Sequence, residues 1–208
     1  MEKKSGMKKR IIIIGASGHG KVVADIATKT YEEIYFLDDA LMAECMGYPV
    51  VGKSTEYQKY INDSDFFVAI GNESIRERIL ENLKQDGANI ATLIHPSAVV
   101  AQRVSIGMGS VIMAGAVVNP DTLIGKGCII NTCASIDHDG AIGDFVHISV
   151  GAHLAGTVDV GKNTFIGAGA TIINNVNITE NCIIGAGAVV INDILESGTY
   201  VGVPAKCL

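Results

Sequence analysis

The chain has 208 residues, 48% of them hydrophobic and only 5% aromatic, and its formal charge at pH 7 is −6. An acidic chain without a basic stripe cannot neutralise phosphates, so we exclude nucleic-acid binding. No apolar run approaches the length that spans a bilayer or forms a signal peptide, so we expect a cytoplasmic protein without membrane insertion. Five cysteines without a C-x-x-C pair are expected to stay reduced.

Residues 1–90 are predicted to form a small Rossmann-like parallel α/β domain. Residues 10–14, an arginine followed by four isoleucines, read as a buried strand, and a glycine-rich turn over 15–20 leads into an amphipathic helix over 21–27. Further strands are expected over 34–37 and 65–70, with a helix over 74–85, which makes a sheet of three or four strands.

Three loops of this domain are expected to meet at one edge of the sheet. They are the turn at residues 15–20, the pair Asp38 and Asp39, and the pair Gly71 and Asn72. Ligands bind at the carboxyl ends of strands in open α/β sheets, and a helix N-terminus favours anions. The glycines follow G-x-x-G-x-G rather than the dinucleotide pattern G-x-G-x-x-G, so we do not expect an NAD site. The alternative is that these glycines only permit a tight turn.

The second part of the chain, residues 91–208, is dominated by a repeat of six. From Ile94 to Val190 every sixth residue is Ile, Val or Leu, and four residues later a small side chain follows. An exact period of six predicts a parallel β-helix of triangular coils, three hexads to a coil, with the aliphatic residues inside. Glycines that directly follow the aliphatic residue, such as Gly107 and Gly143, are expected to adopt a left-handed backbone.

The outward histidines are the candidates for chemistry. His138 lies between Asp137 and Asp139, and an imidazole paired with a carboxylate is held in one tautomer and made more basic, as a general base requires. His147 and His153 fall on the same coil at different corners, so within one chain the three imidazoles point apart and converge only beside a neighbouring prism.

Three alternatives remain open for these histidines. One is a solvated surface histidine between two acids. Another is a zinc site between subunits, as in the hexapeptide-repeat carbonic anhydrases, although the flanking carboxylates of His138 speak against it. The third is a non-catalytic solenoid that serves as a trimeric scaffold or as a sensor of sugar nucleotides.

Several motifs together give the chain a family resemblance. They are residues 14–20, 36–39 and 69–72, Asn131-Thr132, His138-Asp139, 147–152 and the closing 201–206. On these residues the chain resembles the bacterial sugar acyltransferases of the sialic acid O-acetyltransferase type, and within them the branch that N-acetylates UDP-4-amino sugars in the bacillosamine pathway. The resemblance implies a left-handed β-helix, a homotrimer with active sites between adjacent prisms, acetyl-CoA as cosubstrate, a nucleotide-sugar substrate and no required metal.

The resemblance also implies roles for individual residues. His138 would be the general base and Asp139 the residue that raises its basicity, where the family often carries Glu. His147 would contact the thioester of acetyl-CoA and Asn131 the sugar. The remaining expected contacts are Ala168 and Ala186 with the pantetheine, Lys206 with the CoA phosphates, Ser17, Gly18 and His19 with the phosphates of the sugar nucleotide, Asp38 and Asp39 with its uracil and ribose, and Gly71 and Asn72 with the same pocket.

The expected reaction is direct N-acetylation of a nucleotide-linked amino sugar. His138 would take a proton as the amine attacks the thioester carbonyl, and no covalent enzyme intermediate is needed. O-acetylation of a hydroxyl on sialic acid or another surface sugar is the alternative, because one His–Asp pair can activate either nucleophile.

Overall fold

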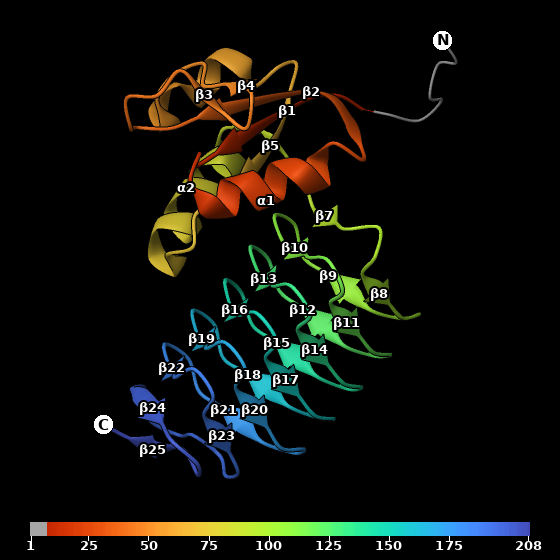
Figure 1. The fold of residues 1–208 in the computed structure, drawn as a ribbon, viewed down its shortest axis with the longest axis vertical. Coiled ribbons are helices and arrows are strands. Elements are labelled where there is room, and N and C mark those ends of the chain that lie inside the picture. Colours follow the sequence, from red (N-terminus) through yellow and green to blue (C-terminus); the bar gives the residue numbers. More distant parts are fainter. Residues whose placement is uncertain (1–7) are drawn as a thin grey trace. The chain divides into compact units, whose positions relative to one another are not determined.

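The computed structural model describes residues 8–208 (Figure 1), which fall into two compact units. The first unit reaches Leu93, and the second runs from Ile94 to Leu208. The first contains the predicted parallel α/β fold and the second the predicted β-helix, so the expected fold class is confirmed.

The first unit is built on a four-stranded parallel sheet with the strand order β2-β1-β5-β6. Its strands are β1 (Lys8–Ile14), β2 (Tyr31–Leu37), β5 (Asp65–Val68) and β6 (Asn89–Ile90), and its helices are α1 (Gly18–Ala27) and α2 (Glu73–Gln85). A small hairpin of β3 (Glu44–Cys45) and β4 (Tyr48–Pro49) and a 3-10 helix, η1 (Ser54–Tyr60), lie between β2 and β5.

Helix α1 begins three residues earlier than the glycine pattern predicts. Gly15 makes the turn after β1 with a left-handed φ of 108°, and Ser17 becomes the N-cap residue. A Cβ at Gly20 would stand 2.0 Å from the carbonyl oxygen of Gly15, so this position admits only glycine. The helix can therefore start at Gly18, because Gly20 allows its first turn to pack against the carbonyl oxygen of Gly15.

The core of the first unit lies between the sheet and the two helices. Residues 11–14 of β1 are fully buried, and α1 contacts β1 and β2 through a buried face that includes Val23 and Ile26. Helix α2 contacts β5 and β6 and buries Leu80 and Leu83. Among the residues that the structure describes, no helix is long and apolar enough to cross a membrane.

The second unit is a left-handed parallel β-helix whose short strands stack as rungs along the solenoid (Figure 1). Seventeen two-residue strands, β7 to β23, follow one another every six residues, and each strand from β7 to β20 pairs with the strand eighteen residues further on. The three sheets are β7 (Leu93–Ile94), β10 (Val111–Ile112), β13 (Ile129–Ile130), β16 (His147–Ile148), β19 (Phe165–Ile166) and β22 (Ile183–Ile184); β8 (Val99–Val100), β11 (Val117–Val118), β14 (Ser135–Ile136), β17 (His153–Leu154), β20 (Thr171–Ile172) and β23 (Val189–Val190); and β9 (Ser105–Ile106), β12 (Leu123–Ile124), β15 (Ala141–Ile142), β18 (Asp159–Val160) and β21 (Asn177–Ile178).

The inside of the solenoid holds the repeated aliphatic residues. Each is the second residue of its strand, and all from Ile112 to Val190 are buried. The small residues four positions later fill the corners, and the polar ones among them satisfy their hydroxyls: Ser110 Oγ donates to Gly125 O at 2.8 Å and Thr122 Oγ1 to Asp137 O at 3.1 Å. Because these hydroxyls are paired, Ser and Thr can occupy buried corners that otherwise hold mainly Ala and Val.

The prediction for the glycines that follow the aliphatic residues is wrong. The left-handed conformation falls two residues later, where every sixth residue from Arg103 to Gly187 has a φ between 55° and 73°. Gly107 and Gly143 do not share it; instead, a Cβ there would stand 2.5 Å and 2.7 Å from backbone atoms of the next coil. These glycines are needed because successive coils approach too closely for a side chain.

The chain ends in a hairpin that extends one sheet of the solenoid. Strand β24 (Thr199–Val201) pairs in parallel with β22, and β25 (Lys206–Cys207) pairs with β24 in antiparallel fashion. The sheet that carries His147 therefore continues to the C-terminal hairpin.

Candidate active site

The loops predicted to bind a nucleotide line a pocket of about 540 Å³ at the carboxyl edge of the first sheet. Ser17, Asp38, Asp39 and Gly71 are among its lining residues, as predicted. Gly18, His19 and Asn72 are not. The lining also includes residues without a sequence motif: Ser54, Thr55 and Tyr57 from η1, and Ile75, Arg78, Ile79 and Asn82 from α2.

The two aspartates after β2 hold neighbouring loops in place. Asp38 accepts hydrogen bonds from the backbone N–H of Ala16 at 2.6 Å and of Ala40 at 2.8 Å. Asp39 accepts from both the backbone N–H and the hydroxyl of Ser54 at 2.9 Å. The carboxylates therefore shape the pocket by tying the glycine turn and η1 to the end of β2.

The loop after β5 is held by a buried arginine. Arg76 is 1% exposed, and its Nη1 donates to the carbonyl oxygens of Ile70 at 2.9 Å and Gly71 at 2.8 Å. The Asn72 side chain accepts from Ile75 N at 2.9 Å and so caps α2. Asn72 thus has a structural role at the helix start, while Gly71 faces the pocket.

His19 lies in the first turn of α1, and its environment keeps it neutral. Burial, followed by the charge of Arg76, lowers the pKa of His19 to about 4. Its Nε2 is buried and has no hydrogen-bond partner among the described residues. Ser17, in contrast, is exposed, and as N-cap residue it makes no side-chain capping bond, so its hydroxyl remains available beside the helix N-terminus.

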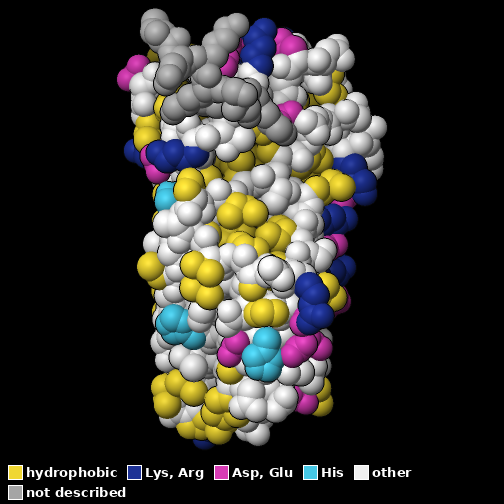
Figure 2. Space-filling view, turned by 90° about the vertical axis from the view of Figure 1, so that its right-hand side faces the viewer, with side chains coloured by type: hydrophobic (Ala, Val, Ile, Leu, Met, Phe, Trp, Pro, Cys, Tyr) yellow, Lys and Arg dark blue, Asp and Glu magenta, His cyan; other side chains and the backbone are white. Residues whose placement is uncertain are grey.

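The His138–Asp139 pair predicted from the sequence forms at the corner between β14 and β15. His138 Nδ1 lies 2.8 Å from Asp139 Oδ2, and both side chains are more than half exposed. This hydrogen bond, followed by the charge of Asp137, raises the pKa of His138. With Nδ1 engaged, Nε2 makes no hydrogen bond within the described part of the chain. Figure 2 shows that histidine and acidic side chains lie exposed on one face of the molecule.

A second carboxylate holds the backbone of the same corner. Asp137 Oδ1 accepts from the side-chain amide of Asn119 and from the backbone N–H of His138, both at 2.8 Å. The Asn119 bond is the main reason why the pKa of Asp137 is lowered. The left-handed φ of Asp139, 57°, turns its side chain back towards His138. Asp tolerates this conformation better than most residues.

Asn131 and His147, predicted to contact sugar and thioester, lie side by side. Asn131 Oδ1 accepts from Thr132 N at 2.8 Å, so its amide nitrogen faces His147 Nε2 at 3.1 Å. Because that nitrogen only donates, Nε2 is the accepting atom of the ring in this contact. Phe165 packs edge-on against the ring, with centroids 5.0 Å apart. His147 belongs to the sheet of β13 and β16, whereas His138 follows β14 of another sheet, so one chain does not bring the two imidazoles together.

The residues expected along the pantetheine, Ala168 and Ala186, occupy the same corner one coil apart. They follow β19 and β22, strands of the sheet that carries His147, and Gly187 N donates to Ala168 O at 2.8 Å. Within the described residues their own backbone N–H groups donate no hydrogen bond. Lys206 is exposed on β25, at the end of the same sheet.

The remaining histidines have local partners. His153 Nδ1 lies 2.8 Å from Ser135 Oγ, and His95 Nδ1 accepts from Ser97 N at 3.0 Å. Over residues 8–208, no three His, Cys, Asp or Glu side chains gather as a metal site.

Replacing Asp139 by Asn should move the acidic limb of the activity profile to lower pH. The general-base role expected for His138 requires the neutral imidazole, so activity should decline as the pH falls through its raised pKa. Asn lacks the carboxylate that is the main cause of the raised pKa of His138, so the acidic limb should move to lower pH. Asn also no longer fixes the tautomer of the imidazole, so kcat at the plateau of the profile should fall by up to about 10²-fold. The measurement is kcat/KM against pH. Asp121→Asn, at the same left-handed corner one coil earlier, is the control; an unshifted limb for Asp139→Asn contradicts the pairing.

Comparison with known proteins identifies both halves of the chain. The family model of the PglD N-terminal domain matches residues 10–83, and that of the bacterial transferase hexapeptide (six repeats) matches residues 157–192. A curated relative, the UDP-N-acetylbacillosamine N-acetyltransferase of Bacillus subtilis (strain 168), is 39% identical over 112 residues. This match spans 51% of the chain and 52% of the relative, so the chain spans about half the length of that relative.

Two similar solved structures cover nearly the whole chain. The acetyltransferase domain of PglB from Neisseria gonorrhoeae FA1090, in complex with acetyl coenzyme A, is 42% identical with a TM-score of 0.94, covering 97% of this chain and 100% of that chain. PerB from Caulobacter crescentus, in complex with CoA and GDP-perosamine, is 38% identical with a TM-score of 0.88, covering 95% of this chain and 96% of that chain. The Caulobacter protein was also solved with one histidine changed to asparagine or alanine.

The likeness therefore extends over both units, with a domain of the PglD N-terminal type before the hexapeptide repeats. The chain belongs to the bacterial hexapeptide-repeat sugar acyltransferases whose N-terminal domain is of the PglD type.

Proposed function

We propose that this protein transfers the acetyl group of acetyl-CoA to the amine of a nucleotide-linked amino sugar, of the UDP-4-amino-sugar type. The observation that carries the proposal is the 2.8 Å contact between His138 Nδ1 and Asp139 Oδ2, which leaves Nε2 open on the solenoid surface. Similar proteins support the same chemistry: curated relatives are named UDP-N-acetylbacillosamine N-acetyltransferase and GDP-perosamine N-acetyltransferase. Two similar structures were solved with acetyl coenzyme A, or with CoA and GDP-perosamine.

The proposed reaction is a direct transfer. His138 Nε2 takes a proton from the sugar amine as its nitrogen attacks the thioester carbonyl; the new C–N bond forms, the C–S bond breaks, and the proton passes to the departing thiolate of CoA. Asp139 stabilises the imidazolium that forms in between. His147, held by Asn131, lies at the thioester, and a backbone N–H at a solenoid corner stabilises the oxyanion.

The nucleotide sugar is assigned to the pocket at the carboxyl edge of the first sheet. Its diphosphate would lie at the N-terminus of α1, where the Ser17 hydroxyl is uncommitted and no acidic residue occupies the first turn. Asp38, Asp39 and Gly71 line the same pocket, which fits the uracil and ribose contacts assigned to the two aspartates. For Gly18, His19 and Asn72 we retain only an indirect role through the turn and the helix starts that they build.

CoA is assigned to the edge of the solenoid that bears Ala168 and Ala186, whose backbone N–H groups can bind the pantetheine amides, with Lys206 near its phosphates. The assembly proposed is a homotrimer. The base at His138 and the pair of Asn131 and His147 belong to different sheets of one chain, so a neighbouring copy is needed to bring a base to a thioester. A cytoplasmic location is part of the proposal and is supported by five free cysteines.

An acetyl-transfer panel tests this function. Purified protein is incubated with acetyl-CoA and UDP-, GDP-, dTDP- or CMP-linked amino sugars, and release of the CoA thiol is followed together with the product mass. We expect turnover with an amino sugar and a product that survives hydroxylamine, which cleaves esters but not amides. A hydroxylamine-labile product would establish O-acetylation instead. Absence of transfer and of CoA binding in calorimetry, with the nucleotide sugar still bound, would contradict the enzyme assignment.

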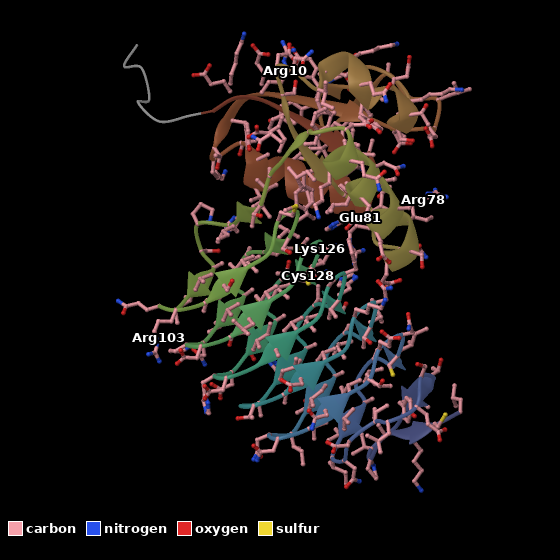
Figure 3. All side chains as sticks on the ribbon, turned by 180° about the vertical axis from the view of Figure 1, so that it is seen from behind. Arg10, Arg78, Glu81, Arg103, Lys126 and Cys128 are labelled. Carbon is pink, nitrogen blue, oxygen red and sulfur yellow. The ribbon has the colours of Figure 1, made fainter. Side chains whose placement is uncertain are left out.

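Replacing Arg78 by Ala should weaken binding of the nucleotide sugar. Arg78, labelled in Figure 3, projects from α2 and lines the pocket that also contains Ser17. It offers a guanidinium to a diphosphate, and loss of one charge-assisted bond raises KM for the nucleotide sugar about tenfold or more while kcat changes little. Steady-state kinetics measures both. Lys84→Ala on the last turn of α2, outside the pocket lining, should leave KM unchanged; equal values for the two variants would remove Arg78 from the site.

A further inference from the structure

Gly156 stands directly beside the ring of His138. It lies eighteen residues, one full coil, after the histidine. A Cβ built on Gly156 would stand 2.7 Å from both Cε1 and Nε2 of His138 and 3.3 Å from Nδ1, and these ring atoms are its three nearest neighbours. Real Cβ contacts essentially never fall below 3.0 Å. The imidazole therefore occupies the space that any side chain at position 156 would need.

The backbone does not require glycine at this position. Gly151 and Gly169 have left-handed φ values of 60° and 66°, and Gly143 and Gly161 lie against backbone atoms of the next coil. Gly156 has neither property, because its φ is outside the left-handed region and its nearest contacts are side-chain atoms alone.

The same place in other coils accepts side chains. Pro120 precedes His138 by one coil, and Asn174 follows Gly156 by one coil. The backbone hydrogen bonds around it are those of an ordinary corner: Thr157 N donates to His138 O at 2.9 Å, and Asn175 N donates to Gly156 O at 3.1 Å. The corner itself thus tolerates a side chain, and the imidazole of the preceding coil is what excludes one here.

We propose that Gly156 is a positioning residue for His138, which leaves room for the imidazole to lie with Nδ1 on Asp139 and Nε2 open to the incoming nucleophile. This role rests on the proposed general-base function of His138. A methyl group at position 156 cannot coexist with the ring where it lies. The ring must leave its place, which breaks or lengthens the bond between Nδ1 and Asp139 and moves the basic nitrogen.

The first test is Gly156→Ala. Misplacing a catalytic group by about 1 Å can cost 10²-fold in rate, so kcat should fall by roughly 10- to 10²-fold. KM for acetyl-CoA and the thermal unfolding midpoint should stay near wild type, because no backbone atom stands within the space of the new methyl group. Gly198→Ala is the matched control: its φ is not left-handed, and its Cβ would meet Cys207 Sγ at 3.3 Å and Tyr200 Cε2 at 3.5 Å. Equal kcat for Gly156→Ala and wild type would overturn the proposal.

A double variant separates positioning from a merely structural role. If Gly156 acts through the imidazole, then adding Gly156→Ala to His138→Ala should not lower the residual rate further. An equal fall in both backgrounds would show that Gly156 acts elsewhere and would overturn the proposal.

A measurement independent of activity distinguishes failure of this inference from failure of the proposed function. The Cε1–H resonance of His138, assigned by its loss in His138→Ala, is titrated by NMR in both proteins. Gly156→Ala should lower the pKa of His138, since the hydrogen bond to Asp139 is its main cause of elevation. If no nucleotide amino sugar is acetylated by the wild type but this pKa falls, the packing inference stands and the proposed function fails. An unchanged pKa overturns the inference whatever the activity.

Discussion

Replacing His138 by Ala should lower kcat for acetyl transfer by about 10²–10⁴-fold, the usual contribution of a general base. The sugar amine is mostly an ammonium at neutral pH, so a group that accepts its proton is needed before or during attack. His138 is suited to this because Asp139 binds Nδ1 at 2.8 Å and leaves Nε2 as the basic atom. Since the exposed imidazole packs no core, the fold and the KM values should change little.

His153→Ala provides the matched control. This histidine is also exposed, and it lies on β17, which pairs with β14, but its Nδ1 binds the hydroxyl of Ser135 rather than a carboxylate. Its loss should leave kcat within about threefold of wild type, because a surface substitution removes no proton acceptor. Added imidazole should partly restore His138→Ala, since the small base can enter the vacated space. A rate for His138→Ala close to wild type would exclude the residue as the base.

Replacing Ile184 by Ala should lower the free energy of unfolding by about 2–5 kcal/mol, as expected for a large-to-small change in a packed core. Ile184 is the inward residue of β22 and is fully buried between Ile166 and the next rung. In a narrow solenoid the neighbouring coils cannot collapse into the space, because their backbones are already in register on both sides. The lost methyl groups therefore leave a cavity.

Its neighbour in the same strand gives the control. Ile183 faces outward and is 50% exposed. Both changes replace Ile by Ala in one two-residue strand, so differences in β-propensity cancel, and Ile183→Ala should cost no more than about 1 kcal/mol. Urea unfolding followed by circular dichroism measures both, with the midpoint shifted and the slope unchanged. Equal costs for the two variants would contradict the assignment of inward and outward positions.

The sequence alone determined the architecture of the second half. In a triangular coil the same position of every hexad points inside. The Ile, Val or Leu at every sixth position from Ile94 onward therefore predicts the β-helix without coordinates. The pairing of His138 with Asp139 was also accessible, because the two are adjacent in the chain and a corner places both outside. The parallel sheet of the first unit and the meeting of its loops at one carboxyl edge followed from the βαβ pattern, whereas the strand order did not.

Contacts across coils and between elements were decided only by the tertiary structure. Asn131 meets His147, sixteen residues away, and the ring of His138 covers Gly156, because coil spacing sets which residues stack. The left-handed corner lies two residues beyond the expected glycines, since the stacking distance between coils, not the turn, demands those glycines. The place of Arg78 in the pocket could not be predicted, because a charged residue on a helix is usually exposed to solvent. Only the structure shows that this part of α2 lies beside the carboxyl edge of the sheet. The repeat of six identifies the buried positions, because each coil buries the same positions. A functional site depends instead on individual distances between side chains, and the repeat does not determine these.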